Sequence, residues 1–178
     1  GSDRANRGST GYVEADGVLD ISLKLRKILA DSGYTVMMTR VKDETVALYK
    51  RAEKANAWKG DLFLSIHTNA AADQNIGGAE TFHTLSNEWN NKAHADEAKK
   101  VAQAIQNKLV ASTGLLNRGI KTRLINNPTS VIDKKDYYAV IRRSNMAALI
   151  IEVAFHSNSK EEALLKKDDF RSSAAHSI

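Results

Sequence analysis

The stretches Leu62-Phe-Leu-Ser-Ile-His67 and Ala148-Leu-Ile-Ile-Glu152 decide how this chain folds. Each is a short and mostly apolar run, which is typical of a buried strand in a parallel sheet. Each run also ends at a titratable side chain, His67 or Glu152. Open α/β sheets place ligands and catalytic groups at the carboxyl ends of such strands. The sequence therefore predicts that both strand ends open on one edge of a sheet and bring His67 and Glu152 into one site.

Helix and strand patterns alternate along the rest of the chain. Val18, Ile21, Leu25 and Ile28 fall on one helical face, and Gly33 follows as a stop signal. Further helices are expected over residues 43–58 with Asp43 as N-cap, over about 93–111, and in two pieces from residue 160; strands are expected at 34–39, 61–66, 79–84, 137–141 and 147–153. This alternation predicts an α/β fold, a three-layer α/β/α domain around a mostly parallel twisted sheet.

Composition narrows the classes of protein that fit. The 178 residues suffice for a single domain, and the absence of cysteine excludes disulfides, zinc fingers and cysteine nucleophiles. The net charge of +5 favours an anionic partner such as a bacterial cell wall. Basic residues are dispersed and aromatic residues make up only 6%, so we expect no nucleic-acid binding. No apolar run approaches the roughly 20 residues of a membrane span. We expect a monomer with no membrane span.

Three residues are candidates for the site, and each also has a purely structural interpretation. Imidazole is the commonest zinc ligand, but His67 could instead be a hydrogen-bonded structural histidine. Glu152 could accept a proton from a metal-bound water or form an ion pair with a residue such as Arg142. Glu14 precedes the first helical face, where a carboxylate also stabilises the helix dipole. His156 is close enough in sequence to Glu152 to line the site.

The segments that carry these residues resemble, in order and spacing, the zinc-dependent N-acetylmuramoyl-L-alanine amidases of the LytC/AmiC type. The matching segments cover nearly the whole chain: Gly11-Tyr-Val-Glu14, Gly33-Tyr-Thr-Val-Met-Met-Thr-Arg40, Arg51-Ala-Glu-Lys-Ala-Asn56, Asp61-Leu-Phe-Leu-Ser-Ile-His-Thr-Asn69, Gly78-Ala-Glu-Thr81, Thr113-Gly-Leu115, Arg118-Gly119 and Ile151-Glu-Val-Ala-Phe-His-Ser-Asn158. Single motifs such as Ser-Ile-His-Thr-Asn are moderately specific, whereas the ordered set is strongly so.

The resemblance implies a function and roles for the three candidates. The family cleaves the amide bond between N-acetylmuramic acid and L-alanine in peptidoglycan, with a zinc ion (Zn2+) held by two histidines and a glutamate. Matched by position, Glu14 and His67 are metal ligands and Glu152 is the catalytic base. The family's first strand and first histidine ligand would precede Gly1, so we expect residues 1–178 to be an amidase-like catalytic domain truncated at both ends.

Residues 117–137 depart from a compact member of this family and are interpreted as an inserted loop near the cleft. Long irregular connections are often functional, so the loop is predicted to be mobile and either to contact substrate or to plug the zinc cleft. Its basic residues could meet stem-peptide carboxylates, although a solvated charged loop is an equal alternative: Arg118, Lys121, Arg123, Lys134 and Lys135.

Alternatives to a peptidoglycan amidase remain at this stage. They are a zinc carboxypeptidase or aminoacylase-like hydrolase, and a non-catalytic cell-wall-binding domain with an incomplete metal site. For the amidase that the resemblance implies, the expected location is extracellular or in the cell wall. The sequence does not distinguish an autolysin, a sporulation enzyme and a phage endolysin acting on the wall.

Overall fold

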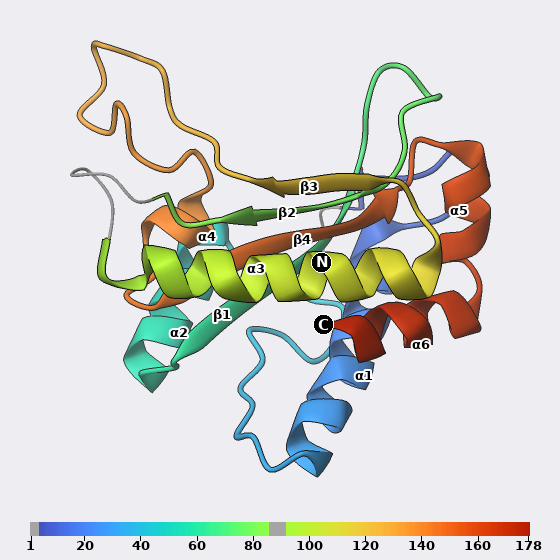
Figure 1. The fold of residues 1–178 in the computed structure, drawn as a ribbon, viewed down its shortest axis with the longest axis horizontal. Coiled ribbons are helices and arrows are strands. Elements are labelled where there is room, and N and C mark those ends of the chain that lie inside the picture. Colours follow the sequence, from blue (N-terminus) through green and yellow to red (C-terminus); the bar gives the residue numbers. More distant parts are fainter. Residues whose placement is uncertain (1–3, 86–91) are drawn as a thin grey trace.

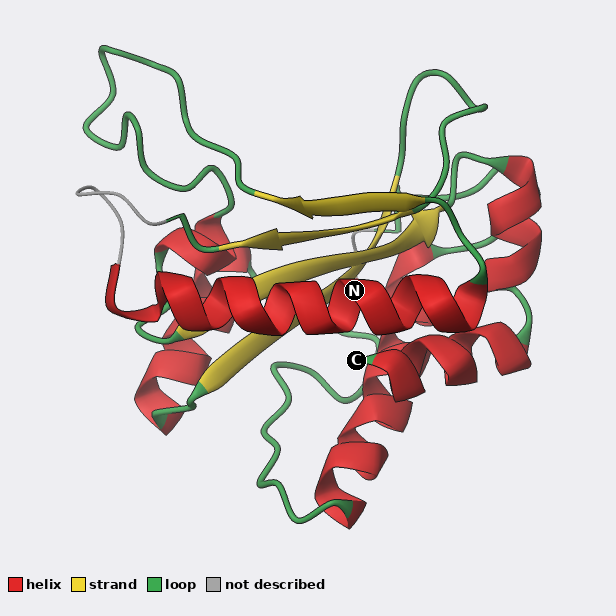
Figure 2. Cartoon of the chain, in the orientation of Figure 1, coloured by secondary structure: helices red, strands yellow, loops and turns green. Residues whose placement is uncertain are grey.

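The computed structural model describes residues 4–85 and 92–178, which form a layered α/β domain (Figures 1 and 2). The elements in chain order are α1 (Glu14–Asp31), α2 (Leu48–Trp58), β1 (Leu62–Asn69), β2 (Ala79–His83), α3 (Lys92–Thr113), β3 (Asn117–Lys121), α4 (Ala139–Arg142), β4 (Ala147–Phe155), α5 (Ser159–Leu165) and α6 (Asp168–Ser177). In this part of the chain, none of the helices combines the length and hydrophobicity needed to cross a bilayer.

The four strands form one twisted sheet in the order β1-β4-β2-β3 (Figure 2). β1 pairs with β4 in parallel, and β2 pairs with β3 in parallel. β2 runs antiparallel to β4, so the sheet is mostly parallel with one antiparallel junction at its centre. The prediction of an α/β fold around a mostly parallel sheet is confirmed.

Two groups of helices cover the two faces of the sheet, and hydrophobic side chains pack between them and the strands. On one face, Leu149, Ile151 and Val153 of β4 pack with residues of α1, α3 and α6. On the other face, Phe63, Phe82 and Ile150 pack with apolar residues of α2 and α4. This alternation along β4 is expected of a strand covered on both sides, and it explains the continuous apolar run in the sequence.

Residues 34–39 do not form the expected strand. They lie along the edge of the sheet, separated from β1 by a cavity of about 480 Å³ lined by residues such as Val36, Met38 and Leu62. A strand requires a neighbour to accept and donate its backbone hydrogen bonds. In the described part of the chain, no strand pairs with this segment, so its β-like side-chain pattern alone does not make it a strand.

Three other boundaries also differ from the expectation. Residues 117–121, expected to be part of a loop, are the strand β3 beside β2. Residues 137–141, expected to be a strand, mostly enter the short helix α4, whose Val140 and Ile141 are buried. α2 begins at Leu48 and not near Asp43; Ala47 occupies the N-cap position, and the Asp43 carboxylate is ion-paired with Arg4. The two helical pieces of the tail, α5 and α6, are confirmed.

Candidate active site

A row of three titratable side chains crosses the sheet near the carboxyl ends of β1 and β4. His67 of β1 lies directly opposite Glu152 of β4, and Glu152 lies directly opposite Glu80 of β2. Residues that pair directly across neighbouring strands project from the same face. The sheet therefore brings His67 and Glu152 together as predicted, and it adds Glu80, which sequence reasoning did not place in the site.

Glu14 reaches this row from the first turn of α1. One carboxylate oxygen, Oε1, lies 3.0 Å from Nδ1 of His67 and accepts a hydrogen bond of 3.1 Å from the Thr68 amide. The other oxygen, Oε2, accepts a 2.7 Å bond from the Asn6 side chain. The side chain of Glu14 is thus buried against β1, and its main contacts are to other side chains of the site. Glu14 does lie in the first turn of α1, as the helix-dipole interpretation requires, but that interpretation does not account for these contacts.

The contact between Glu14 and His67 favours the charged form of both groups. Burial alone would raise the pKa of Glu14, but the hydrogen bond and charge of His67 bring it below its usual value. Burial alone would lower the pKa of His67, but Glu14 and the charge of Glu152 raise it above its usual value. Each of the two groups thus shifts the pKa of the other toward its charged form.

The same two side chains fit two positions of a zinc site. A carboxylate oxygen and an imidazole nitrogen 3.0 Å apart are compatible with two ligands of one ion whose bonds are about 2.0–2.2 Å long. Within residues 4–85 and 92–178, no group of three or more His, Cys, Asp or Glu side chains forms a metal-binding cluster. Among the described residues, Glu14 and His67 are therefore the pair whose chemistry and spacing fit such an ion.

The carboxyl group of Glu152 is buried without full hydrogen bonding. Its Oε2 is buried and has no hydrogen-bond partner among the described residues. Burial raises the pKa of Glu152 to about 7, with the charges of Glu14 and Glu80 adding to the effect and His67 opposing it. The expected structural alternative, an ion pair with Arg142, is wrong, because the Arg142 guanidinium donates to the backbone carbonyls of Asp136 and Tyr137. A carboxyl group that titrates near neutral pH suits general acid–base chemistry.

Glu80, by contrast, is fully compensated. Its carboxylate accepts bonds of 2.7 Å from Arg118, 2.5 Å from Lys121 and 2.9 Å from Asn69. Burial would raise the pKa of Glu80, but the two cations hold it below its usual value. A charged residue inside the buried strand β2 was the available sequence signal for this network. Glu80 is therefore ionised beside Glu152 and contributes to its raised pKa.

Two carboxylates of helix α5 accept hydrogen bonds from the backbone next to these residues. Glu162 is fully buried, and its carboxylate accepts hydrogen bonds from the backbone amides of Thr10 and Tyr12, just ahead of Glu14. Glu161 accepts hydrogen bonds from the amides of Gly78 and Phe155, next to β2 and β4. Two adjacent carboxylates on one helix thus fix the chain on both sides of the site.

His156 does not line the site in the way its position in the sequence indicates. It is buried, and its Nδ1 lies 3.0 Å from the hydroxyl of Thr68, which directly follows His67. His156 therefore contacts the end of β1 through Thr68. The remaining histidines lie elsewhere: His83 bonds to the Thr84 carbonyl, His94 lies in α3 and His176 in α6.

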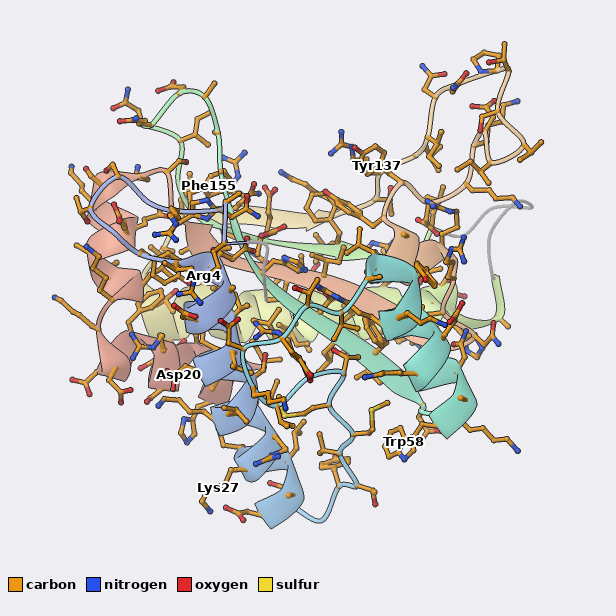
Figure 3. All side chains as sticks on the ribbon, turned by 180° about the vertical axis from the view of Figure 1, so that it is seen from behind. Arg4, Asp20, Lys27, Trp58, Tyr137 and Phe155 are labelled. Carbon is orange, nitrogen blue, oxygen red and sulfur yellow. The ribbon has the colours of Figure 1, made fainter. Side chains whose placement is uncertain are left out.

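The connection between β3 and α4 is ordered at its base. The Tyr137 amide donates to the Arg123 carbonyl at 2.8 Å, and Ile125 exchanges backbone hydrogen bonds with Lys134 and Lys135. Residues 122–138 therefore form a hairpin-like projection, which extends away from the sheet beyond β3 (Figures 1 and 3). Backbone hydrogen bonds fix the base of this projection, and Tyr138 packs there against Phe82 of β2. The mobility of the projection stays a prediction.

Comparison with known proteins agrees with this geometry. A family model described as N-acetylmuramoyl-L-alanine amidase matches residues 1–178. The chain belongs to this family of peptidoglycan amidases.

Individual relatives support the same assignment. N-acetylmuramoyl-L-alanine amidase LytC of Bacillus subtilis is 31% identical over 94% of this chain and 30% of its own length. The endolysin of Bacillus phage SPP1 is 32% identical over 98% of this chain and 59% of its own length. The catalytic domain of CwlV, an amidase from Bacillus (Paenibacillus) polymyxa var. colistinus, superposes with a TM-score of 0.82 at 29% identity, covering all of this chain and 88% of that domain. The chain thus spans from under a third to about three fifths of these two curated relatives.

Proposed function

We propose that this domain hydrolyses the amide bond between N-acetylmuramic acid and L-alanine in peptidoglycan, using a zinc ion held in part by Glu14 and His67. The observation that carries the proposal is the placement of a buried, partly unpaired carboxyl group, Glu152, directly opposite His67, which in turn contacts Glu14. Membership of the amidase family and the names of its relatives support the reaction.

Each residue of the row has a defined task in this reaction. When bound, zinc supplies Lewis-acid chemistry, polarising the amide carbonyl and lowering the pKa of a water molecule. Glu152 accepts a proton from the attacking water at its unpaired Oε2 and passes it to the leaving nitrogen of L-alanine. The new bond joins the water oxygen to the lactyl carbonyl carbon, and the carbon–nitrogen bond breaks. Glu80 stays ionised and keeps Arg118 and Lys121 in place.

The proposed substrate sets the place of action. Peptidoglycan lies outside the cytoplasmic membrane, so we propose that the domain acts extracellularly or in the cell wall, as a secreted bacterial protein or as a phage endolysin. Its relatives include an example for each route: LytC is a bacterial amidase, and the endolysin comes from a phage. We further propose that the domain acts as a monomer.

Analysis of the products tests the reaction. Purified peptidoglycan is incubated with the zinc-loaded protein, and new amino termini and new reducing sugar ends are quantified. Amidase activity releases peptides that begin with L-alanine and leaves the glycan chains intact, whereas a carboxypeptidase releases free amino acids. Binding to peptidoglycan without any release would favour a wall-binding domain instead.

A matched pair of variants assigns the role of Glu152. Glu152→Gln keeps the size of the side chain and removes the basic oxygen, so turnover should fall by about 10²–10⁴-fold with zinc still bound. Glu97→Gln makes the same change at an exposed position of α3 and should have no effect. Near-normal turnover of Glu152→Gln would show that another group is the base.

A further inference from the structure

A stacked arginine lies on the same face of the sheet as the polar row. Tyr138 packs against Phe82 of β2 with ring centroids 4.9 Å apart, and Phe82 is two residues along the strand from Glu80. The Arg123 guanidinium lies 3.8 Å from the centroid of the Tyr137 ring and 5.9 Å from that of Tyr138. Figure 3 places Tyr137 at the base of the projection over residues 122–138. Arg123 is thus held beside the site by two aromatic rings.

Among the basic residues at this end of the sheet, Arg123 differs in its partners. Arg118 and Lys121 both donate to the Glu80 carboxylate and are ion-paired with it. Arg123 is exposed, and within residues 4–85 and 92–178 no acidic side chain forms an ion pair with it. Of these three, Arg123 is the one that is exposed and has no carboxylate partner among the described residues, so its charge is open to an anion from solution.

The backbone around Arg123 is already ordered in the protein without substrate. Its carbonyl accepts the Tyr137 amide at 2.8 Å, and a backbone bridge joins the next residue, Leu124, to Asp136. Burial raises the pKa of the neighbouring Tyr138 hydroxyl, the Arg123 side chain opposes this effect, and the charges of Glu152 and Glu80 add to it. The hydroxyl is therefore within electrostatic reach of Glu152. A guanidinium held in this way loses little freedom when it binds a planar carboxylate through two parallel bonds.

We infer that Arg123 binds a carboxylate on the peptide part of the substrate and thereby selects for muramoyl peptides with a free acid near the scissile bond. This inference rests on the proposed function. The lactyl carboxyl group of muramic acid is consumed in the amide bond, so the free carboxylates of the substrate belong to its peptide. The glycan around the scissile bond is uncharged, and Arg123 therefore distinguishes the peptide side of that bond from the sugar side.

The experiment compares two soluble substrates that differ only in charge, N-acetylmuramoyl-L-alanyl-D-glutamate and its fully amidated counterpart. A charge-assisted bidentate contact is worth roughly 10- to 100-fold in affinity. We therefore expect Arg123→Gln to raise KM for the acid by about 10- to 100-fold and for the amide by less than about threefold. Arg123→Lys should recover only part of the preference, because an ammonium cannot form two parallel bonds. Arg143→Gln removes the same charge from an exposed position after α4 and should leave both values unchanged.

Two other outcomes overturn the inference. If KM rises equally for both substrates, Arg123 serves only to pack Tyr137 and Tyr138. If KM changes for neither, Arg123 does not contact the substrate. Calorimetric titration of the same two compounds separates this inference from the proposed reaction, because it measures the preference for the acid even when no cleavage occurs. Wild-type protein that binds both compounds equally would refute the role of Arg123, and wild-type protein that binds the acid selectively without cleaving it would refute the reaction alone.

Discussion

Replacing Glu162 with glutamine tests whether α5 holds the segment that carries Glu14. The Glu162 carboxylate is fully buried and accepts hydrogen bonds from the Thr10 amide at 2.9 Å, the Tyr12 amide at 3.0 Å and the Ser9 hydroxyl at 3.3 Å. A hydrogen bond to a charged group contributes about 1.5–3 kcal/mol. Glutamine keeps one acceptor oxygen and turns an NH₂ group toward the remaining donors. We therefore expect Glu162→Gln to lower the free energy of unfolding by about 2–4 kcal/mol at pH 7, a large share of the roughly 5–15 kcal/mol of a typical domain.

The pH dependence of this loss identifies its cause. Burial would raise the pKa of Glu162, but the bonds from Tyr12 and Thr10 bring it below its usual value in the folded protein. A carboxylate with a lowered pKa stabilises the fold above its unfolded-state pKa of about 4.3, and this stabilisation is lost as the pH falls through the folded-state value. The difference between wild type and Glu162→Gln should therefore be complete at pH 7 and shrink below about pH 4.

Urea denaturation at a series of pH values measures both quantities, with Glu97→Gln as the control for loss of an exposed carboxylate on α3. The zinc content of Glu162→Gln at pH 7 should also fall, because Glu14 follows the tethered segment directly. A difference below about 0.5 kcal/mol at pH 7, or one that persists unchanged at pH 3, would refute the reasoning, because ordinary surface substitutions reach about that size.

Three further predictions follow from the site and its surroundings. His67→Ala should lose most of its zinc by elemental analysis, and retention of a full equivalent would remove His67 from the ligand set. Deleting residues 124–133 should lower activity on peptidoglycan if the projection contacts substrate and raise it if the projection plugs the cleft; unchanged activity and wall affinity would leave a solvated loop. Gly78→Ala should destabilise the fold by more than about 2 kcal/mol, because its φ is +112° and a Cβ would lie 2.4 Å from the Leu116 carbonyl oxygen. Gly114→Ala, with φ +68° and open space, should cost about 1 kcal/mol in the same thermal or urea unfolding; equal losses would show that the close contact has no effect.

The parts of the fold that could be predicted are those whose own residues bury a face. α1, α3, β1 and β4 have apolar patterns that match their period, and Gly33 and Gly114 follow the helices as expected. β3 could not be found in this way. Its sequence Asn-Arg-Gly-Ile-Lys is mostly polar, because it lies at the edge of the sheet and Arg118 and Lys121 reach Glu80 from it.

Tertiary contacts decided the segments where local preference was misleading. Tyr137 and Tyr138 favour a strand, but the segment turns into α4, which buries Val140 and Ile141 against α2. The pattern of residues 34–39 is that of a strand, but pairing is a property of two segments. In the site, His67 and Glu152 were predictable because a strand end is visible in the sequence. Glu80 was not, because its significance depends on the register between β2 and β4.

The carboxylates of α5 determine when the site can form during synthesis. Glu14 emerges from the ribosome well before Glu162, the side chain that holds its segment. At about 5–20 residues per second, roughly 7–30 s of translation separate the two. Glu152 and Glu161 also follow Glu14 by well over a hundred residues, so neither the row nor its support is complete before α5 has been synthesised. Assembly of the site therefore waits for α5, and a ribosome-bound chain that stops short of this helix lacks a complete candidate site.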